Sequence, residues 1–117
     1  MKFDVFCEIQ RAFPWGDGQD EASLFRETIA QARAAEAAGF ETWWQVEHHG
    51  APQFSYSSAP EIVLTAIAMA TERLRIGHAG VLAPFNINSP LGVAERGATL
   101  EGLSVTLVEQ EPELPRA

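Results

Sequence analysis

The sequence predicts an α/β fold in which three strand–helix units build a parallel sheet. Three short apolar segments, at about residues 3–9, 41–47 and 75–81, have the composition of strands. The segments between them carry apolar residues at helical spacing. The strands start roughly 35 residues apart, which leaves room for the helical crossover that joins parallel neighbours. We therefore expect a three-stranded parallel sheet with its helices on one side.

Composition narrows the class of protein. The 117 residues fit one small domain, with 46% hydrophobic and 21% charged residues, as in ordinary globular proteins. A net charge of −8 repels phosphate backbones and argues against nucleic acid as a partner. The sequence contains no run of about 18 apolar residues, which argues against a membrane span. A single cysteine, Cys7, and an N-terminus unlike a signal peptide favour a cytoplasmic protein.

The first helix is bounded by recognisable capping residues. Asp20 or Ser23 can cap its start, and Gly39 stands where a left-handed residue ends a helix. For the second helix, Ser58 to Glu61 resembles a capping box that includes Pro60.

The sequence also predicts a third helix and, after it, a C-terminal tail. Ser89-Pro90 begins the third helix. We expect residues 1–104 to form the domain and residues 105–117 a divergent tail. Val105 to Val108 has the composition of a short fourth strand. The acidic residues 109–117, with two prolines, indicate disorder.

Two architectures contain such units, the open doubly wound sheet and the (β/α)8 barrel. No Gly-x-Gly-x-x-Gly fingerprint follows the first strand, which weakens the case for a dinucleotide-binding fold. In both architectures ligands bind beyond the C-terminal ends of the strands. The long loops 10–20, 47–57 and 82–89 lie there, and we expect the functional site among them.

Glu47-His48-His49, at the end of the second strand, is the sharpest chemical feature. A histidine titrates near neutral pH and suits acid–base catalysis, although from the triplet alone hydrogen bonding within a loop is the better explanation. Neighbouring side chains on a strand point to opposite faces, so we expect no metal site. Cys7 reads as a small buried hydrophobe. Gly77, Ala79 and Gly80 allow either a flat ligand or a bulky neighbour to approach the third strand.

The order of these residues resembles the bacterial luciferase-like family of flavin-dependent monooxygenases over residues 1–104. The matching segments are Met1-Lys2-Phe3, Pro14-Trp15, Ala35 to Phe40, Glu47-His48-His49, Ser57 to Glu61, Arg75 to His78, Pro90, Val93 to Arg96, Ala98 to Leu100 and Leu103-Ser104. The resemblance implies the first three βα units of a (β/α)8 barrel. It also implies a small organic substrate, oxidised with reduced FMN and O2 or with a deazaflavin. His48 falls on the family's acid–base histidine, and Ala79–Gly80 falls on the cis peptide that supports the flavin ring.

The sequence departs from the family after Ser104, where relatives continue with Gly-Gly-Arg. A complete barrel of this type needs about 250 residues. We therefore expect the chain to correspond to an N-terminal portion that is not a competent enzyme alone. The alternative is a non-catalytic α/β module. In either case an open sheet edge favours association with a second copy or another chain.

Overall fold

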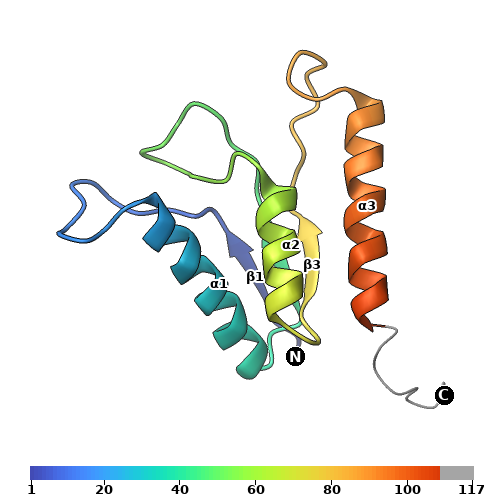
Figure 1. Ribbon diagram of the computed structural model, residues 1–117, viewed down its shortest axis with the longest axis horizontal. Coiled ribbons are helices and arrows are strands. Elements are labelled where there is room, and N and C mark those ends of the chain that lie inside the picture. Colours follow the sequence, from blue (N-terminus) through green and yellow to red (C-terminus); the bar gives the residue numbers. More distant parts are fainter. Residues whose placement is uncertain (109–117) are drawn as a thin grey trace.

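A computed structural model describes the backbone of residues 1–108 and the side chains of residues 1–103. Strands and helices alternate in this part of the chain (Figure 1). The elements are β1 (Asp4–Cys7), α1 (Glu21–Ala37), β2 (Thr42–Gln45), α2 (Pro60–Ala70), β3 (Arg75–His78) and α3 (Pro90–Val108). The strands form one parallel sheet in the order β1-β2-β3. The helices α1 and α2 cover the same face of it, as the sequence predicts.

The strands are shorter than the expected segments because the chain leaves the ladder after one further hydrogen bond. The backbone N–H of Val46 still donates to Cys7, and that of Ala79 to Gln45. By contrast, the N–H of His48 donates to Ser57, within the loop after β2. The segments that begin at these points are the loops in which we expect the site.

The helix boundaries confirm the expected caps of α1. Asp20 and Ser23 form a reciprocal capping box, in which each side chain accepts a hydrogen bond from the backbone N–H of the other. Gly39 has a φ of 85°, the left-handed conformation that ends a helix at low steric cost. The chain is thereby turned into β2 within a few residues.

Two expectations about the helices are wrong. Ala59, rather than Ser58, is the N-cap of α2, without a side-chain hydrogen bond, because Pro60 occupies the first helical position. Residues 105–108, expected as a short fourth strand, instead belong to α3, which extends to Val108. Their β-branched composition is a weak preference that helix propagation overrides. The expected disorder of residues 109–117 lies outside the described residues.

The register of the sheet assigns each strand residue to a face. Val5, Trp43 and Ile76 are paired across the three strands and face the helices. Trp43 is 1% exposed. The buried core between sheet and helices consists of Cys7, Ile9, Leu24, Ala32, Ala35, Trp43, Leu64, Ile67, Leu74 and Leu100.

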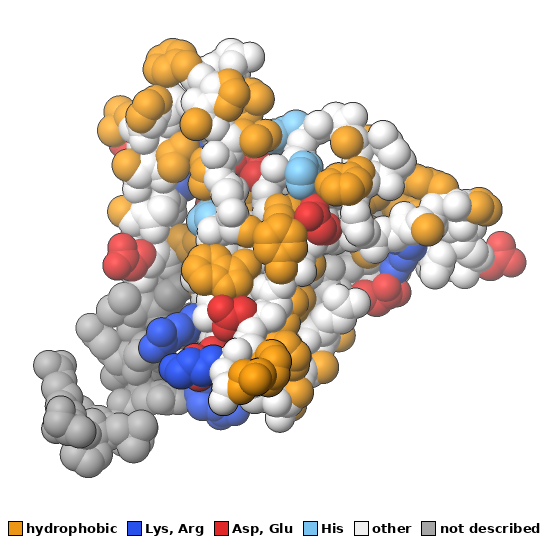
Figure 2. Space-filling view, turned by 180° about the vertical axis from the view of Figure 1, so that it is seen from behind, with side chains coloured by type: hydrophobic (Ala, Val, Ile, Leu, Met, Phe, Trp, Pro, Cys, Tyr) orange, Lys and Arg blue, Asp and Glu red, His pale blue; other side chains and the backbone are white. Residues whose placement is uncertain are grey.

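The opposite face of the sheet is open. Phe6, Trp44 and Gly77 are paired on it, and Phe6 is 63% exposed. Figure 2 shows this side, with large apolar side chains over the sheet and histidine and acidic side chains nearby. The Trp44 indole donates from Nε1 to Asp4 Oδ2 at 3.0 Å. A Cβ at Gly77 would lie 2.6 Å from Cε3 of Trp44. Of the two readings of Gly77, the bulky neighbour is therefore the correct one.

One carboxylate joins the other end of the sheet to α1. Oε1 of Glu36 accepts the backbone N–H groups of Glu72, Arg73 and Leu74 at 2.9, 2.5 and 2.8 Å. Burial acts to raise the pKa of Glu36, but these hydrogen bonds and the Arg73 charge outweigh it and hold the pKa below its ordinary value. The turn between α2 and β3 is therefore held by a residue of α1.

We predict that Gly77→Ala displaces the Trp44 ring. Overpacking of this kind should lower the free energy of unfolding by about 1–3 kcal/mol and shift the tryptophan fluorescence. Gly80→Ala is the matched control, because a Cβ at Gly80 has no neighbour within 4 Å. Equal losses in the two variants would contradict the packing of Trp44 on Gly77. Chemical denaturation with a fluorescence readout measures both quantities.

We predict that Glu36→Ala lowers the free energy of unfolding by about 1–2 kcal/mol, since three backbone donors lose a charged acceptor. The native pKa is the lower one, so the stabilisation is present above the ordinary glutamate pKa of about 4.3 and is lost as the pH falls through the native value. The difference between the variant and the wild type should therefore shrink in acid. Glu72→Ala, whose side chain is 82% exposed, is the control and should change little. Urea denaturation at several pH values tests this.

Candidate functional site

The loops beyond the C-terminal ends of the strands bring a carboxylate and an imidazole together. Glu8 follows β1 and His48 follows β2. Nε2 of His48 lies 3.1 Å from Oε2 of Glu8, and their side chains are 37% and 25% exposed. Phe54 packs edge-on against the imidazole, with ring centroids 5.1 Å apart. His48 is therefore half-buried, oriented by two neighbours and still accessible.

The backbone beside Glu8 has an unusual conformation. Ile9 has a φ of 52°, in the left-handed region that a β-branched residue rarely adopts. Its side chain is 3% exposed and belongs to the core. The Ser55 hydroxyl donates to the Glu8 carbonyl, and the Tyr56 N–H donates to the Ile9 carbonyl at 3.0 Å. The loop after β2 thus fixes the bend that follows β1.

His49 has a different partner. Its Nε2 donates to Oε1 of Glu47 at 2.8 Å, and its side chain is 39% exposed. The adjacent histidines therefore contact separate carboxylates and do not converge on one point. Within the described part of the chain, no three His, Cys, Asp or Glu side chains are grouped as metal ligands.

Glu47 is the centre of a buried hydrogen-bond network. Besides His49, it accepts from Asn88 Nδ2 at 2.8 Å and from the Leu82 N–H at 2.9 Å. Glu47 and Asn88 are each 8% exposed. Burial acts to raise the pKa of Glu47, but the hydrogen bonds from His49, Asn88 and Leu82 outweigh it and lower the pKa. Glu47 is therefore a structural anion that holds the loop after β3.

The network continues into the helices. Arg96 on α3 donates from Nη2 to Oδ1 of Asn88 at 2.6 Å and from Nε to Oε1 of Glu61 at 3.1 Å. Glu61 lies in the first turn of α2. The two loops and the two helices next to the site are thus joined through charged and amide side chains.

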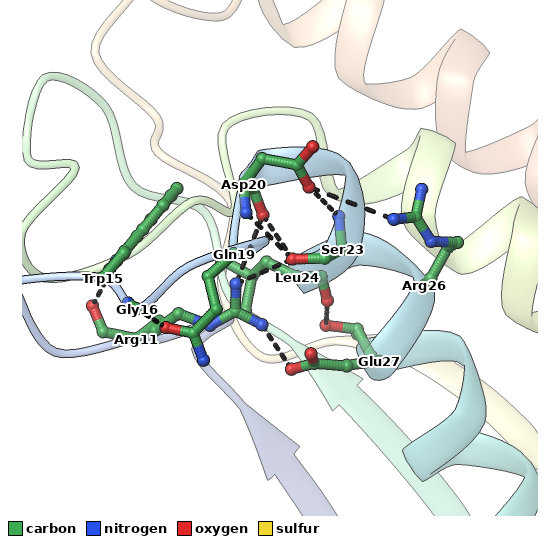
Figure 3. Close-up of polar contacts among 10 residues, drawn as sticks. Arg11, Trp15, Gly16, Gln19, Asp20, Ser23, Leu24, Arg26 and Glu27 are labelled. Atoms are coloured by element: carbon green, nitrogen blue, oxygen red, sulfur yellow. Dashed lines mark hydrogen bonds and ion pairs between the residues drawn. The ribbon is translucent and has the colours of Figure 1, made fainter.

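The loop after β1 is fixed by Arg11, whose side chain is 10% exposed (Figure 3). Its guanidinium donates to Ser23 Oγ at 2.9 Å and to the Asp20 carbonyl at 3.2 Å, and it forms an ion pair with Glu27. The guanidinium also lies 5.5 Å from the centre of the Trp15 ring. This loop is tied to the start of α1 by a cation that is fully engaged.

Trp15, in the loop after β1, packs between two aromatic rings. It stacks on Phe13, with centroids 5.1 Å apart and an interplanar angle of 2°, and contacts Tyr56 at 5.4 Å. Tyr56 belongs to the loop after β2. The aromatic contacts therefore join the first two loops at the mouth of the sheet.

The end of β3 leaves space near the site. Ala79 remains in the sheet ladder, and Gly80 has open space where a Cβ would stand. The cis bond in the described residues joins Phe13 to Pro14, and the Ala79–Gly80 bond is trans. The cis geometry expected at Ala79–Gly80 concerned the complete, flavin-bound enzyme and stays a prediction.

Cys7 contributes no chemistry to this mouth. It is buried in the core, as expected, and burial raises the pKa of its thiol.

None of the helices in the described residues combines the length and the apolar character of a membrane span.

The sequence predicts site residues at His48, Ala79 and Gly80, which the structure places after β2 and β3, but it does not predict Glu8 or the network of Glu47. The alternation of faces along β1 places Glu8 on the same side as Phe6, which was the available signal. The partners of Glu47 are brought together only by the fold.

Comparisons with known proteins show which family this chain resembles. The family model described as luciferase-like monooxygenase matches residues 1–105. YwcH of Bacillus subtilis (strain 168) is 37% identical over 100 residues, covering 86% of this chain and 29% of the relative. The oxygenase component of the flavin-dependent trigonelline monooxygenase of Acinetobacter baylyi (strain ATCC 33305 / BD413 / ADP1) is 31% identical, covering 73% of this chain and 22% of that protein.

A solved structure agrees. The monooxygenase RslO1 from Streptomyces bottropensis is similar with a TM-score of 0.75 and 30% identity, over 89% of this chain and 30% of that one. The chain thus spans less than a third of these relatives. The predicted fold class, three βα units as in a (β/α)8 barrel, is confirmed by the parallel sheet and by this neighbour. The chain belongs to the luciferase-like monooxygenase family.

Proposed function

We propose that this chain carries the acid–base side of a flavin-dependent monooxygenase site that oxidises a small organic substrate with reduced flavin and O2. One observation carries the proposal. A half-exposed imidazole, His48, stands against Glu8 where ligands bind in parallel α/β folds, beyond the C-terminal ends of the strands. Family membership supports the reaction class, and the name of the Acinetobacter relative supports a flavin.

The described residues fit the ring of a flavin. Gly80 leaves open space beyond β3, and Ala79 presents only a methyl group beside it. A planar, largely uncharged ring system suits such a surface, because no side chain has to move aside. His48 follows β2, the strand next to β3. We assign Ala79 and Gly80 to the ring and propose FMN, with a deazaflavin as the alternative.

The bound flavin would supply the electrons that activate O2 for transfer of one oxygen atom to the substrate. The contribution of this chain is proton transfer and orientation. A histidine ring nitrogen can accept or return one proton, and we assign this role to His48. Phe54 covers one side of the imidazole and limits its contact with water.

The described residues offer few groups that could bind the flavin phosphate. A phosphate is best held by a free arginine or by several backbone N–H groups. Arg11 is engaged by Ser23 and Glu27, and Arg96 by Asn88 and Glu61. We therefore propose that the 117-residue chain alone binds FMN weakly and does not turn over substrate.

The lone buried Cys7 is in keeping with a cytoplasmic protein.

We predict that the purified chain binds FMN with a Kd of about 0.1 mM or weaker, because Arg11 and Arg96, in the described part of the chain, are already engaged by other side chains. Quenching of flavin fluorescence measures the Kd, and gel filtration measures the oligomeric state. Riboflavin, which lacks the phosphate, is the matched ligand and should bind about as well as FMN. A monodisperse monomer that binds FMN at low micromolar Kd and oxidises substrate would show that this part of the proposal is wrong.

We predict that His48→Ala lowers kcat far more than His49→Ala. The readout is a hybrid in which residues 1–105 replace the matching part of RslO1. Loss of a general acid or base should lower kcat by about 10²–10⁴-fold. In His49→Ala, Glu47 keeps its hydrogen bonds from Asn88 and Leu82, so we expect less than about a tenfold loss. Equal effects, or the reverse order, would contradict the role of His48.

A second candidate function is a non-catalytic module that associates through the sheet. The exposed Phe6 and Trp44 on the open face favour it, since large apolar side chains gathered on one face mark association surfaces. Absence of any flavin binding, together with a stable oligomer in gel filtration, would favour this alternative.

A further inference from the structure

We propose that Glu8 is a positioning residue for His48 and that it makes Nδ1, rather than Nε2, the nitrogen that exchanges protons with the reactants. The inference rests on the proposed acid–base function of His48 and deepens it, because it names the working atom. Neither family membership nor the sequence pattern assigns a role to Glu8.

The assignment of the nitrogen follows from the contact. Nε2 of His48 lies 3.1 Å from Oε2 of Glu8. An ionised carboxylate can only accept hydrogen bonds, so it favours a proton on the nitrogen that faces it. A neutral imidazole carries one N–H and one lone pair. With the proton on Nε2, the lone pair is on Nδ1, for which the described residues provide no hydrogen-bond partner. Nδ1 is then the nitrogen able to accept a proton.

Oε2 of Glu8 has no hydrogen-bond partner among the described residues. Oε2 is shielded from solvent and lies within ion-pair distance of the imidazole, but the contact does not reach hydrogen-bond geometry. A buried carboxylate oxygen without a well-aligned donor is costly for stability alone. A small rotation of the imidazole would align Nε2 with it. The arrangement therefore fits a pair that tightens when a ligand occupies the mouth.

The backbone around the pair is built to hold this geometry. The loop after β2 carries His48, whose N–H donates to Ser57, and further along it fixes the carbonyls of Glu8 and Ile9. Ile9 is kept in the left-handed region by these bonds and by its burial. Strained residues of this kind cluster at functional sites. One loop thus sets both members of the pair.

The other carboxylate near the pair, Glu47, is hydrogen-bonded to groups other than His48. Glu47 faces His49, Asn88 and Leu82 rather than His48. Among the described residues, Glu8 is accordingly the carboxylate in contact with the His48 ring. A neutral imidazole beside a carboxylate is not a full ion pair and adds little to stability, so the main effect of the contact is on the proton position and the orientation of the ring.

Histidine tautomers in the 117-residue chain test the proposal without any turnover. Long-range ¹H–¹⁵N spectra, recorded at rising pH until the ring signals no longer move, separate protonated from unprotonated ring nitrogens. In the wild type, His48 should give a single Nε2–H tautomer, with Nδ1 at the downfield position of an unprotonated nitrogen. In Glu8→Ala the Nδ1 signal should move upfield to the average of a mixture. Glu8→Gln, which keeps an acceptor oxygen, should recover part of the shift.

The controls separate positioning from folding. Glu41→Gln removes a carboxylate from the opposite end of the sheet and should leave the His48 signals unchanged. Unchanged signals from His49 and His78 in Glu8→Ala would show that the fold is retained. If Glu8→Ala does not fold, Glu8→Gln takes its place, and its Nδ1 signal must then differ from that of the wild type.

A protonated Nδ1 in the wild type, or identical His48 spectra with and without Glu8, would overturn the proposal. Loss of activity in the hybrid His48→Ala variant reports on the proposed function and not on Glu8. Full activity of that variant together with the expected tautomer shift would refute the acid–base function while leaving the pairing intact.

Discussion

The buried carboxylate of Glu47 is the constraint on which the mouth of this sheet depends. An anion that is 8% exposed must be matched by donors, and those donors come from the loops after β2 and β3. Asn88, one of them, is in turn bonded to Arg96, which reaches Glu61 on α2. Removal of the Glu47 carboxylate would leave the Leu82 N–H without its acceptor. The positions of both loops are therefore coupled to the packing of α2 and α3.

The side chains on the two faces of β2 make different contacts that hold the sheet together. Trp43 and Gln45 face the helices, and the buried Gln45 amide donates to the Cys7 carbonyl and to Ser57. This side chain therefore holds β1 and the loop after β2 together from inside the core. On the other face, Trp44 lies against Gly77 and bonds Asp4. One indole spans all three strands there, and the glycine of β3 is what permits it.

Much of this architecture was predictable because it depends on local signals. The period of the apolar residues, the Asp20–Ser23 cap and Gly39 each act within a few residues, and they place α1 and β2 correctly. The position of His48 beyond the C-terminal end of β2 was also predictable, from its place after a strand, whereas its role stays a prediction. The contacts of Glu8, Glu36 and Glu47 were not predictable, since each joins residues roughly 35 to 45 positions apart in a fold held by the parallel strand spacing. Short β-branched runs such as residues 105–108 misled because propensity yields to helical context.

The adjacent histidines illustrate how a fold separates structural from chemical roles. His48 and His49 follow one another in the loop after β2, yet each meets its own carboxylate. Glu47 is saturated with three donors and its lowered pKa keeps it charged, which suits a fixed structural anion. Glu8 lacks such donors and faces an accessible imidazole instead. A group whose hydrogen bonds are already complete gains little from a ligand, whereas an incompletely matched pair can gain alignment when one binds. The capacity for proton transfer therefore resides in the less satisfied of the two pairs.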